Sequence, residues 1–321
     1  MLAFDPVQTD QQLGSGPLQC PLRSVAAELC GAPHRPTCRV HIQHFTDPLS
    51  AWCWATEPTL LHLSELLGGY VSIEHRMIGL MESVEPDDSA SSDDALNRPS
   101  QLTMHWEEVG YLSGMPMDSD FWLERPIASS WPACAAVKAA QSQDPRRASH
   151  YLRRLREAAL CNGEDLADTR ILEKHANLVG LDASRLGSDL ENGTAGAAFN
   201  EDMRLAAETG AIAPPSFFFF GPAGLAEIRG ARTIEDMLSA VERVAGEPVP
   251  LCASPRSVAN RHGYVKALAS SRGSIAAAEI VELFEVERTV ASDLLDRMAA
   301  GGSLRRAKAG SSSLYLPLSR S

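Results

Sequence analysis

The sequence predicts an α/β fold made of two units, and three observations support this prediction. Residues 39–77 show a strand, helix and strand pattern, and residues 118–210 are helical with regular interruptions. A strand, a hairpin and a closing helix follow over residues 214–245. At 321 residues, with 44% hydrophobic and 22% charged residues, the chain has the length and composition of two globular units.

The first unit begins with a β-α-β pattern. Apolar residues alternate over 39–45, which is typical of a strand, and a helix is expected from Ser50 onward. Leucines at helical spacing over 60–67 form one apolar face, and a glycine pair ends the helix. Residues 71–77 form the second expected strand. Parallel strands need a crossover connection, which the helix supplies.

An acidic, serine-rich segment over residues 82–100 is expected to be a surface loop without chemistry. The helical stretch after it is expected to be an insertion between strands, with segments over 131–141, 145–161, 165–179, a short piece after 182, and 195–209. Residues 217–220 then predict a strand, and a turn leads to a second short strand through Ile228. A helix is expected over 233–244 and a stiff linker over 247–250.

Composition restricts the location and the partners. The N-terminus lacks the basic and apolar regions of a secretory signal, and no run approaches the roughly 18 apolar residues of a membrane helix. We therefore expect a soluble, cytoplasmic protein that does not contact a membrane. The net charge of -12 disfavours non-specific binding to nucleic acid. Seven cysteines in a reducing compartment predict no disulfide framework.

One segment carries the most information about function. Residues 45–54 read FTDPLSAWCW and resemble the active-site turn of the DsbA family, in particular its FrnE-type cytosolic branch, where DPLCxxCW precedes the first helix. Residues 130–140 and 151–158 resemble the start and the continuation of that family's helical insertion. Residues 214–217 resemble its cis-proline loop, with Pro215 at the cis position.

The resemblance covers about residues 39–245. It implies a thioredoxin-like fold with a helical insertion (DsbA-like) over residues 38–246, in which the insertion of about 118–210 lies over the active-site turn and Pro215 lies beside it. It also implies thiol-disulfide oxidoreductase chemistry on protein thiols or a small thiol, with no metal. At the positions that match the family's active site, the candidate catalytic residues are Ser50, Cys53 and Pro215, and the candidate substrate-groove residues are Trp52, Trp54 and Pro214.

The motif departs from the family at the first cysteine position. The family's nucleophile is a thiolate stabilised by the helix N-terminus. Here that position is Ser50, so the motif reads Ser-x-x-Cys and cannot close a disulfide on itself. The first hypothesis is therefore an oxidoreductase relative with weak or altered redox activity, in which Cys53 acts with Cys20, Cys30, Cys38 or a partner thiol.

Two other interpretations of Ser50 remain open. The related kappa-class glutathione transferases and hydroxychromene-carboxylate isomerases carry serine at the matching place and hold a glutathione thiolate with it, which would make glutathione or another small thiol the cofactor. Alternatively the site has lost catalysis, and the fold is a non-enzymatic regulator or adaptor, as in the protease-adaptor branch of the same family. Cys53 is then a small core residue.

Residues 1–37 are expected to be an extension without clear periodicity. Cys20, Cys30 and Cys38, with His34 among them, offer a zinc site or a redox sensor, although their spacing fits no tight zinc motif. Cys134 and Cys161 lie on helical faces and are expected to be core residues.

Residues 254–321 predict a small winged helix-turn-helix domain. They contain ten Lys and Arg residues against six Asp and Glu residues, and two short helices are followed by a hairpin with a basic tip. For DNA, the second helix would enter the major groove and the hairpin would contact phosphates. The candidate nucleic-acid residues are Arg288, Ser292, Arg305, Arg306 and Lys308. The alternative is a domain for dimerisation, giving a homodimer, or for protein contact.

Overall fold

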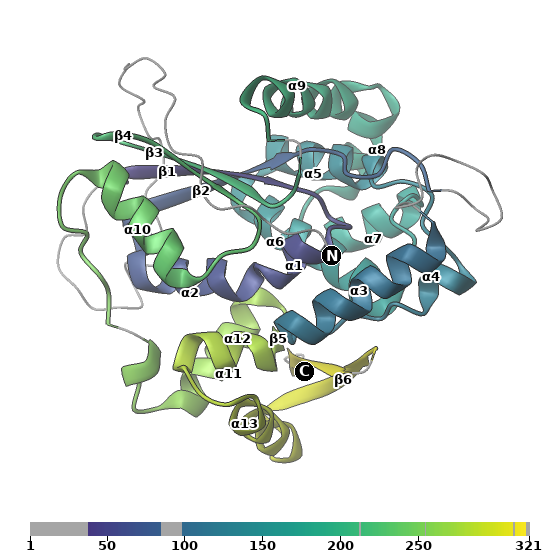
Figure 1. The fold of residues 1–321 in the computed structure, drawn as a ribbon. Helices are drawn as coiled ribbons and strands as arrows, with labels where there is room; N and C mark the ends of the chain where they lie inside the picture. Colours follow the sequence, from purple (N-terminus) through teal and green to yellow (C-terminus); the bar gives the residue numbers. More distant parts are fainter. Residues whose placement is uncertain (1–37, 85–97, 212, 254, 311, 319–321) are drawn as a thin grey trace.

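The computed structural model describes residues 38–84, 98–211, 213–253, 255–310 and 312–318. Its central sheet has the strand order β2-β1-β3-β4, with β1 Val40–Thr46, β2 Val71–Met77, β3 Ser216–Gly221 and β4 Gly224–Arg229 (Figure 1). β1 and β2 are parallel, whereas β3 is antiparallel to both β1 and β4. The expected strands at 39–45 and 71–77 are confirmed.

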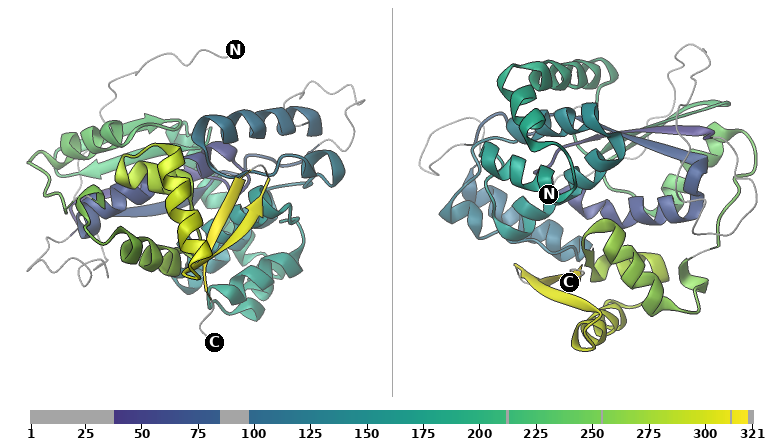
Figure 2. Two further views of the ribbon diagram at one scale, coloured as in Figure 1. Left: turned by 90° about the horizontal axis from the view of Figure 1, so that it is seen from below. Right: turned by 180° about the vertical axis from the view of Figure 1, so that it is seen from behind.

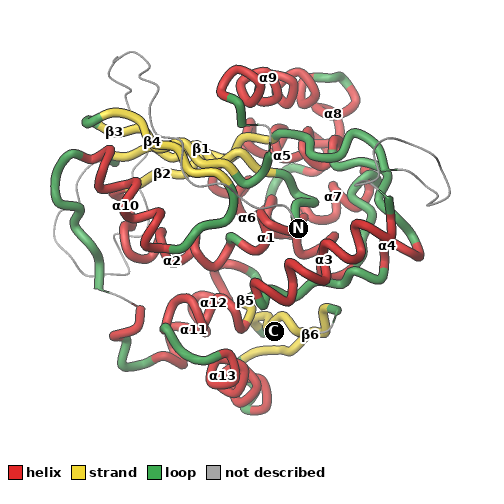
Figure 3. Tube along the Cα trace, viewed as in Figure 1, coloured by secondary structure: helices red, strands yellow, loops and turns green. Residues whose placement is uncertain are grey.

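Side chains of β3 alternate between the two faces of the sheet. Phe217 and Phe219 lie in a core with α2 (Glu57–Leu67) and α10 (Ile234–Ala245). Phe218 faces the opposite side, where it packs near the end of α9 (Thr194–Thr209). Helices therefore cover both faces of the sheet (Figures 1 and 3).

The helix that was expected to start at Ser50 is two helices. A five-residue helix, α1 (Ala51–Ala55), ends at Thr56, and α2 starts at Glu57. Pro58 lies in the first turn of α2, where its missing N–H costs no hydrogen bond. The break is therefore built into the sequence by this proline.

The helical insertion connects β2 to β3. Its elements are α3 Pro99–Ser113, α4 Phe121–Glu124, α5 Trp131–Gln143, α6 Pro145–Arg156 with a π-helical continuation Glu157–Cys161, α7 Thr169–Leu178, α8 Ala183–Glu191 and α9. The insertion begins earlier than the expected residue 118, because α3 buries Leu102, Trp106 and Val109 at helical spacing. No helix was predicted for residues 99–113.

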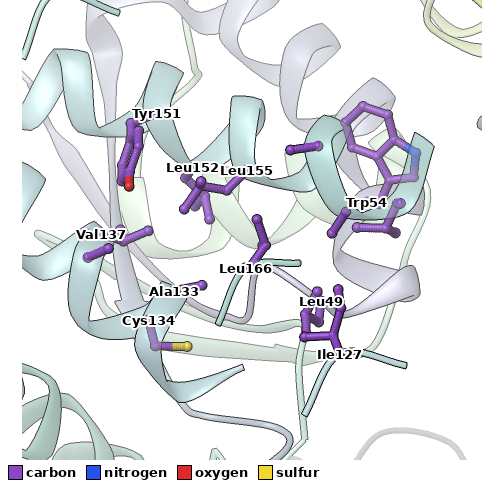
Figure 4. Packing of buried hydrophobic residues seen from close by; sticks show 14 of the residues in the cluster. Leu49, Trp54, Ile127, Ala133, Cys134, Val137, Tyr151, Leu152, Leu155 and Leu166 are labelled. Atoms are coloured by element: carbon purple, nitrogen blue, oxygen red, sulfur yellow. The ribbon is translucent and has the colours of Figure 1, made fainter. Parts of the chain in front are cut away.

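The core of the insertion includes the residues that enter α1. Leu49 and Trp54 pack among residues of α5 and α6 and of the neighbouring loops, including Leu152, Leu155 and Ile127 (Figure 4). The Nε1 atom of Trp54 donates a hydrogen bond to the carbonyl oxygen of Pro116, at 2.9 Å. The insertion and the first turn after β1 thus form one packed body.

The C-terminal part contains α11 Arg261–Arg272, β5 Ile275–Ala276, α12 Ala277–Phe284, α13 Arg288–Ala300, β6 Leu304–Ala309 and β7 Ser312–Pro317. Its sheet has the order β5-β7-β6. The small sheet is present, while the winged-helix assignment stays a prediction. These elements lie against α2 and α3 (Figures 1 and 2), and Leu61 of α2 belongs to their apolar core.

Candidate functional site

The turn between β1 and α1 is held by Asp47, a residue that the sequence analysis did not select. Its buried carboxylate accepts hydrogen bonds from the backbone N–H of Leu49, the N–H of Leu80 and the hydroxyl of Ser130, each at 2.7 Å. These three donors come from the turn, the segment after β2 and the start of α5. An Asp-Pro pair just after a strand, together with a serine opening the insertion, was the available signal.

Ser50 caps α1. Its side chain is almost fully buried, and its Oγ accepts a hydrogen bond from the backbone N–H of Cys53, at 3.2 Å. This is the usual bond of an N-cap serine, which stabilises a helix start by about 1 kcal/mol. The hydroxyl at the family's nucleophile position therefore accepts a hydrogen bond from the backbone of its own helix.

Cys53 is fully buried. Burial raises the pKa of its thiol, although Arg156 and the hydroxyls of Ser50 and Thr46 act in the opposite direction. A thiol that is both inaccessible and protonated is a poor nucleophile. The core interpretation of Cys53 fits this geometry.

The Pro214–Pro215 peptide bond is cis, as the family resemblance implies. Strand register brings this bond toward the turn, because Ser216 of β3 pairs with Phe45 at the end of β1, and Ser50 follows shortly after. Pro215 is buried, and its carbonyl oxygen accepts a hydrogen bond from the N–H of Gly230, at 2.8 Å. Pro214 is half-buried.

The two tryptophans of the motif have different surroundings. Trp54 is fully buried, and the guanidinium of Arg153 lies 5.1 Å from the centre of its ring. This burial leaves Trp54 no surface for a substrate and gives it a packing role. Trp52 is half-buried and lines an open groove.

A buried polar cluster lies beneath the turn. Arg156 is fully buried and donates hydrogen bonds to Thr46 and Glu57. Close by, the Nδ1 atoms of His44 and His75 are 3.2 Å apart. Burial, followed by the positive charge of Arg156, lowers the pKa of His75 to about 4, and burial with His75 and Arg156 lowers that of His44. Both imidazoles are therefore neutral near pH 7.

A second buried network joins the C-terminal part to the rest of the chain. Arg153 of α6 contacts Glu57 of α2 at 3.1 Å and Glu279 of α12 at 2.9 Å. Arg272 of α11 reaches the same two carboxylates, at 2.8 and 3.2 Å. Burial alone would raise the pKa of Glu57, but Arg156, Arg153 and Arg272 outweigh it and hold that pKa far below its usual range.

The candidate nucleic-acid residues have different surroundings. Arg288, at the start of α13, lies against α3, because a Cβ at Gly114 would collide with its guanidinium. Ser292 is half-buried. Arg305, Arg306 and Lys308 are exposed on β6, and Arg306 pairs with Asp296 at 3.2 Å.

The hairpin itself is also docked. Ala309 and Leu314 belong to the core of the helical insertion, and Gly310 lies against the backbone of Met117. The contact of Gly310 with Met117 turns the hairpin tip toward the protein, whereas Arg288 is exposed although its guanidinium lies beside Gly114. DNA binding through this part of the chain stays an untested prediction.

The cysteines that were proposed for zinc lie mostly outside the described residues. Within the described ranges, Cys38 is half-buried and no cysteine forms a disulfide. Cys134 and Cys161 are buried, and their sulfurs donate to Asp47 and to the carbonyl oxygen of Pro116. The core assignment of these two cysteines is confirmed.

None of the helices within the described ranges is long and apolar enough to span a membrane.

The sheet, the helical insertion between β2 and β3, and the cis-proline just before β3 define a DsbA-like thioredoxin fold. The profile of a family described as Thioredoxin matches residues 44–230, which is more than half of the chain. The chain belongs to this thioredoxin family.

Curated relatives are protease adapters. The ClpXP adapter protein SpxH of Halalkalibacterium halodurans is 33% identical over 56% of this chain and 58% of its own length. The SpxH of Shouchella clausii is 27% identical over 77% of this chain and 78% of its own length. Most of the curated relatives, including the first, are matched over less than two thirds of their length.

Among solved structures, a Nitrosomonas europaea protein described as a candidate protein disulfide isomerase superposes with a TM-score of 0.53. It is 19% identical, and the match covers 65% of this chain and 96% of that one. This likeness concerns the fold alone.

Proposed function

We propose that this protein is a non-catalytic adaptor that uses a DsbA-like thioredoxin fold to bind another protein and deliver it to a ClpXP-type protease. One observation carries the first half of the proposal. The position of the nucleophile holds Ser50, whose hydroxyl accepts from the N–H of Cys53, and the remaining thiol is buried with a raised pKa. Disulfide exchange needs an accessible thiolate, and this site offers none.

The second half rests on the relatives, which are ClpXP adapter proteins. An adaptor needs a stable scaffold and a binding surface but no redox pair, which agrees with a motif whose turn is still held by Asp47 and capped by Ser50. Protein partners, and a cytoplasmic location where such a protease acts, follow from this proposal.

Two earlier hypotheses are less well supported. A glutathione-binding serine would have to present its hydroxyl to a ligand, whereas that of Ser50 is almost fully buried and bonded to its own helix. An oxidoreductase in which Cys53 acts with another thiol would need an accessible sulfur, whereas Cys53 is fully buried and burial raises the pKa of its thiol.

The test compares protein lifetimes in host cells with and without this chain. An adaptor predicts that a small set of proteins becomes longer-lived when the gene is deleted, and that the effect disappears when ClpX is also absent. Complementation with wild type, with Cys53→Ala and with Ser50→Ala should restore degradation equally. Unchanged lifetimes in the deletion strain, or a requirement for Cys53, would refute the adaptor proposal.

A further inference from the structure

A large open groove lies where the thioredoxin part meets the C-terminal part. It has a volume of about 1120 Å³. Its lining comes from α1, α2, the end of α3 and the start of α10, together with the end of α12 and the start of α13. Drug-sized ligands occupy pockets of roughly 300–1,000 Å³, so this groove exceeds what a small molecule needs. A segment of another protein is a better match in size.

The lining of the groove is acidic. Five carboxylates line it against two guanidinium groups, those of Arg232 and Arg288; the carboxylates are Glu235, Asp236, Glu282, Glu285 and Glu287. Within the described part of the chain, Glu282 contacts His62 and Glu285 pairs with Arg256. By contrast, Glu235, Asp236 and Glu287 are exposed, and none of the three forms an ion pair with a described residue. The surplus negative charge is therefore available to a partner.

Apolar side chains lie between these carboxylates. Besides two alanines, the apolar members are Trp52, Leu112, Ile234, Val281 and Val286. Leu112 is 57% exposed, and the other four are half-buried, so all five keep surface that a partner could cover. Aromatic and aliphatic anchors surrounded by polar groups are the usual composition of a protein-binding patch.

Buried ion pairs hold the two sides of the groove in place in the absence of a partner. Arg153 and Arg272 tie Glu57 of α2 to Glu279 of α12 through buried ion pairs, so the two sides cannot separate without breaking them. A preformed groove avoids part of the ordering cost of binding.

Resting on the adaptor function proposed above, we infer that this groove is the docking site for a cationic segment of the partner protein. That segment carries Lys or Arg residues, which face the surplus carboxylates, and an apolar side chain that packs on Trp52. The same charge excludes phosphate backbones and disfavours glutathione, whose net charge is negative. The inference goes beyond a general protein-binding function because it names both the surface and the chemistry of its ligand.

The first test uses the full chain and a short fluorescein-labelled peptide in which lysine alternates with leucine and alanine. Fluorescence anisotropy should show binding that weakens with added salt, and a peptide with glutamate in place of lysine should not bind. The variant Glu235→Lys/Glu287→Lys should weaken binding by at least about ten-fold, since each reversed charge faces the ligand directly.

The control variant is Glu191→Lys/Glu242→Lys, which changes the net charge equally at two exposed carboxylates outside the groove. It should bind the lysine peptide within about two-fold of wild type. If the two variants lose binding equally, the attraction is non-specific and the inference is wrong. Tighter binding of glutathione or duplex DNA than of the lysine peptide by wild type would also overturn it.

A second test separates this inference from the adaptor proposal. Proteins stabilised by deleting the gene are followed in cells that carry either charge-reversal variant. Loss of their degradation with the groove variant alone supports the docking site. Degradation that survives the groove variant overturns the docking site and leaves the adaptor function standing, whereas no stabilised protein in the deletion strain refutes the adaptor function itself.

Discussion

Replacing Arg153 with methionine tests whether the C-terminal part is locked onto the thioredoxin part. Arg153 is almost fully buried and donates to Glu57 at 3.1 Å, Glu157 at 3.2 Å and Glu279 at 2.9 Å. Methionine keeps much of the packing volume but leaves these carboxylates with less positive charge around them. Removing one partner of a buried ion pair typically costs about 3–5 kcal/mol.

We expect the lower part of that range, about 3 kcal/mol, because Glu279 keeps Arg272 and the backbone N–H of Ala276. The free energy of unfolding is measured by urea denaturation followed by tryptophan fluorescence. Limited proteolysis within residues 247–260 checks whether the C-terminal part separates first. In the double variant Arg153→Met/Glu279→Met, an apolar pair replaces an ion pair, so the loss should be smaller than the sum of the losses in the two single variants.

A matched surface control is Arg204→Met. Arg204 contacts two carboxylates, Glu201 and Glu208, but on the exposed face of α9. Exposed ion pairs contribute little, so the midpoint of denaturation should not change measurably. The reasoning is refuted if Arg153→Met lies within about 1 kcal/mol of wild type, or if the double variant loses as much as both single variants together.

Three further predictions concern the turn and the histidine pair. Ser50→Cys places a thiol at the start of α1, so mild oxidation should form a disulfide with Cys53 that mass spectrometry detects. The rate of insulin reduction should then rise above that of wild type. An unchanged rate would contradict the assignment of this turn. In the wild-type protein, Cys53 should not react with iodoacetamide until urea is added, because its thiol is buried and its pKa is raised. Rapid alkylation of Cys53 in the folded protein would exclude its role as a core residue. The pKa of His75 is about 4 in the folded protein against 6.5 when unfolded, so the unfolded state binds the proton first as the pH drops. The free energy of unfolding should therefore fall between about pH 6.5 and pH 4, by at most about 3 kcal/mol from this residue. In urea titrations His75→Asn should show a smaller dependence of stability on pH than wild type, and an identical dependence would argue against the shift.

Local patterns predicted the elements that depend on local physics. Both parallel strands matched, because β-branched and alternating residues specify an extended, half-buried backbone regardless of distant contacts. The cis bond before Pro215 and the buried cysteines of α5 and the π-helical turn followed from the family resemblance and from helical spacing. The helix α3 was not predicted, although the buried residues Leu102, Trp106 and Val109 have helical spacing.

The sequence by itself determined the missing redox thiol at Ser50, since no fold can supply a sulfur that the chain lacks. Only the tertiary structure decided what surrounds that position. Arg153 and Glu279 are 126 residues apart, and Asp47 and Ser130 are 83 apart. Neither pair leaves a periodic signal, because a buried hydrogen bond depends on where distant elements pack and not on their local propensities. The acidic groove has the same origin, since its two walls come from parts of the chain that only the folded protein brings together.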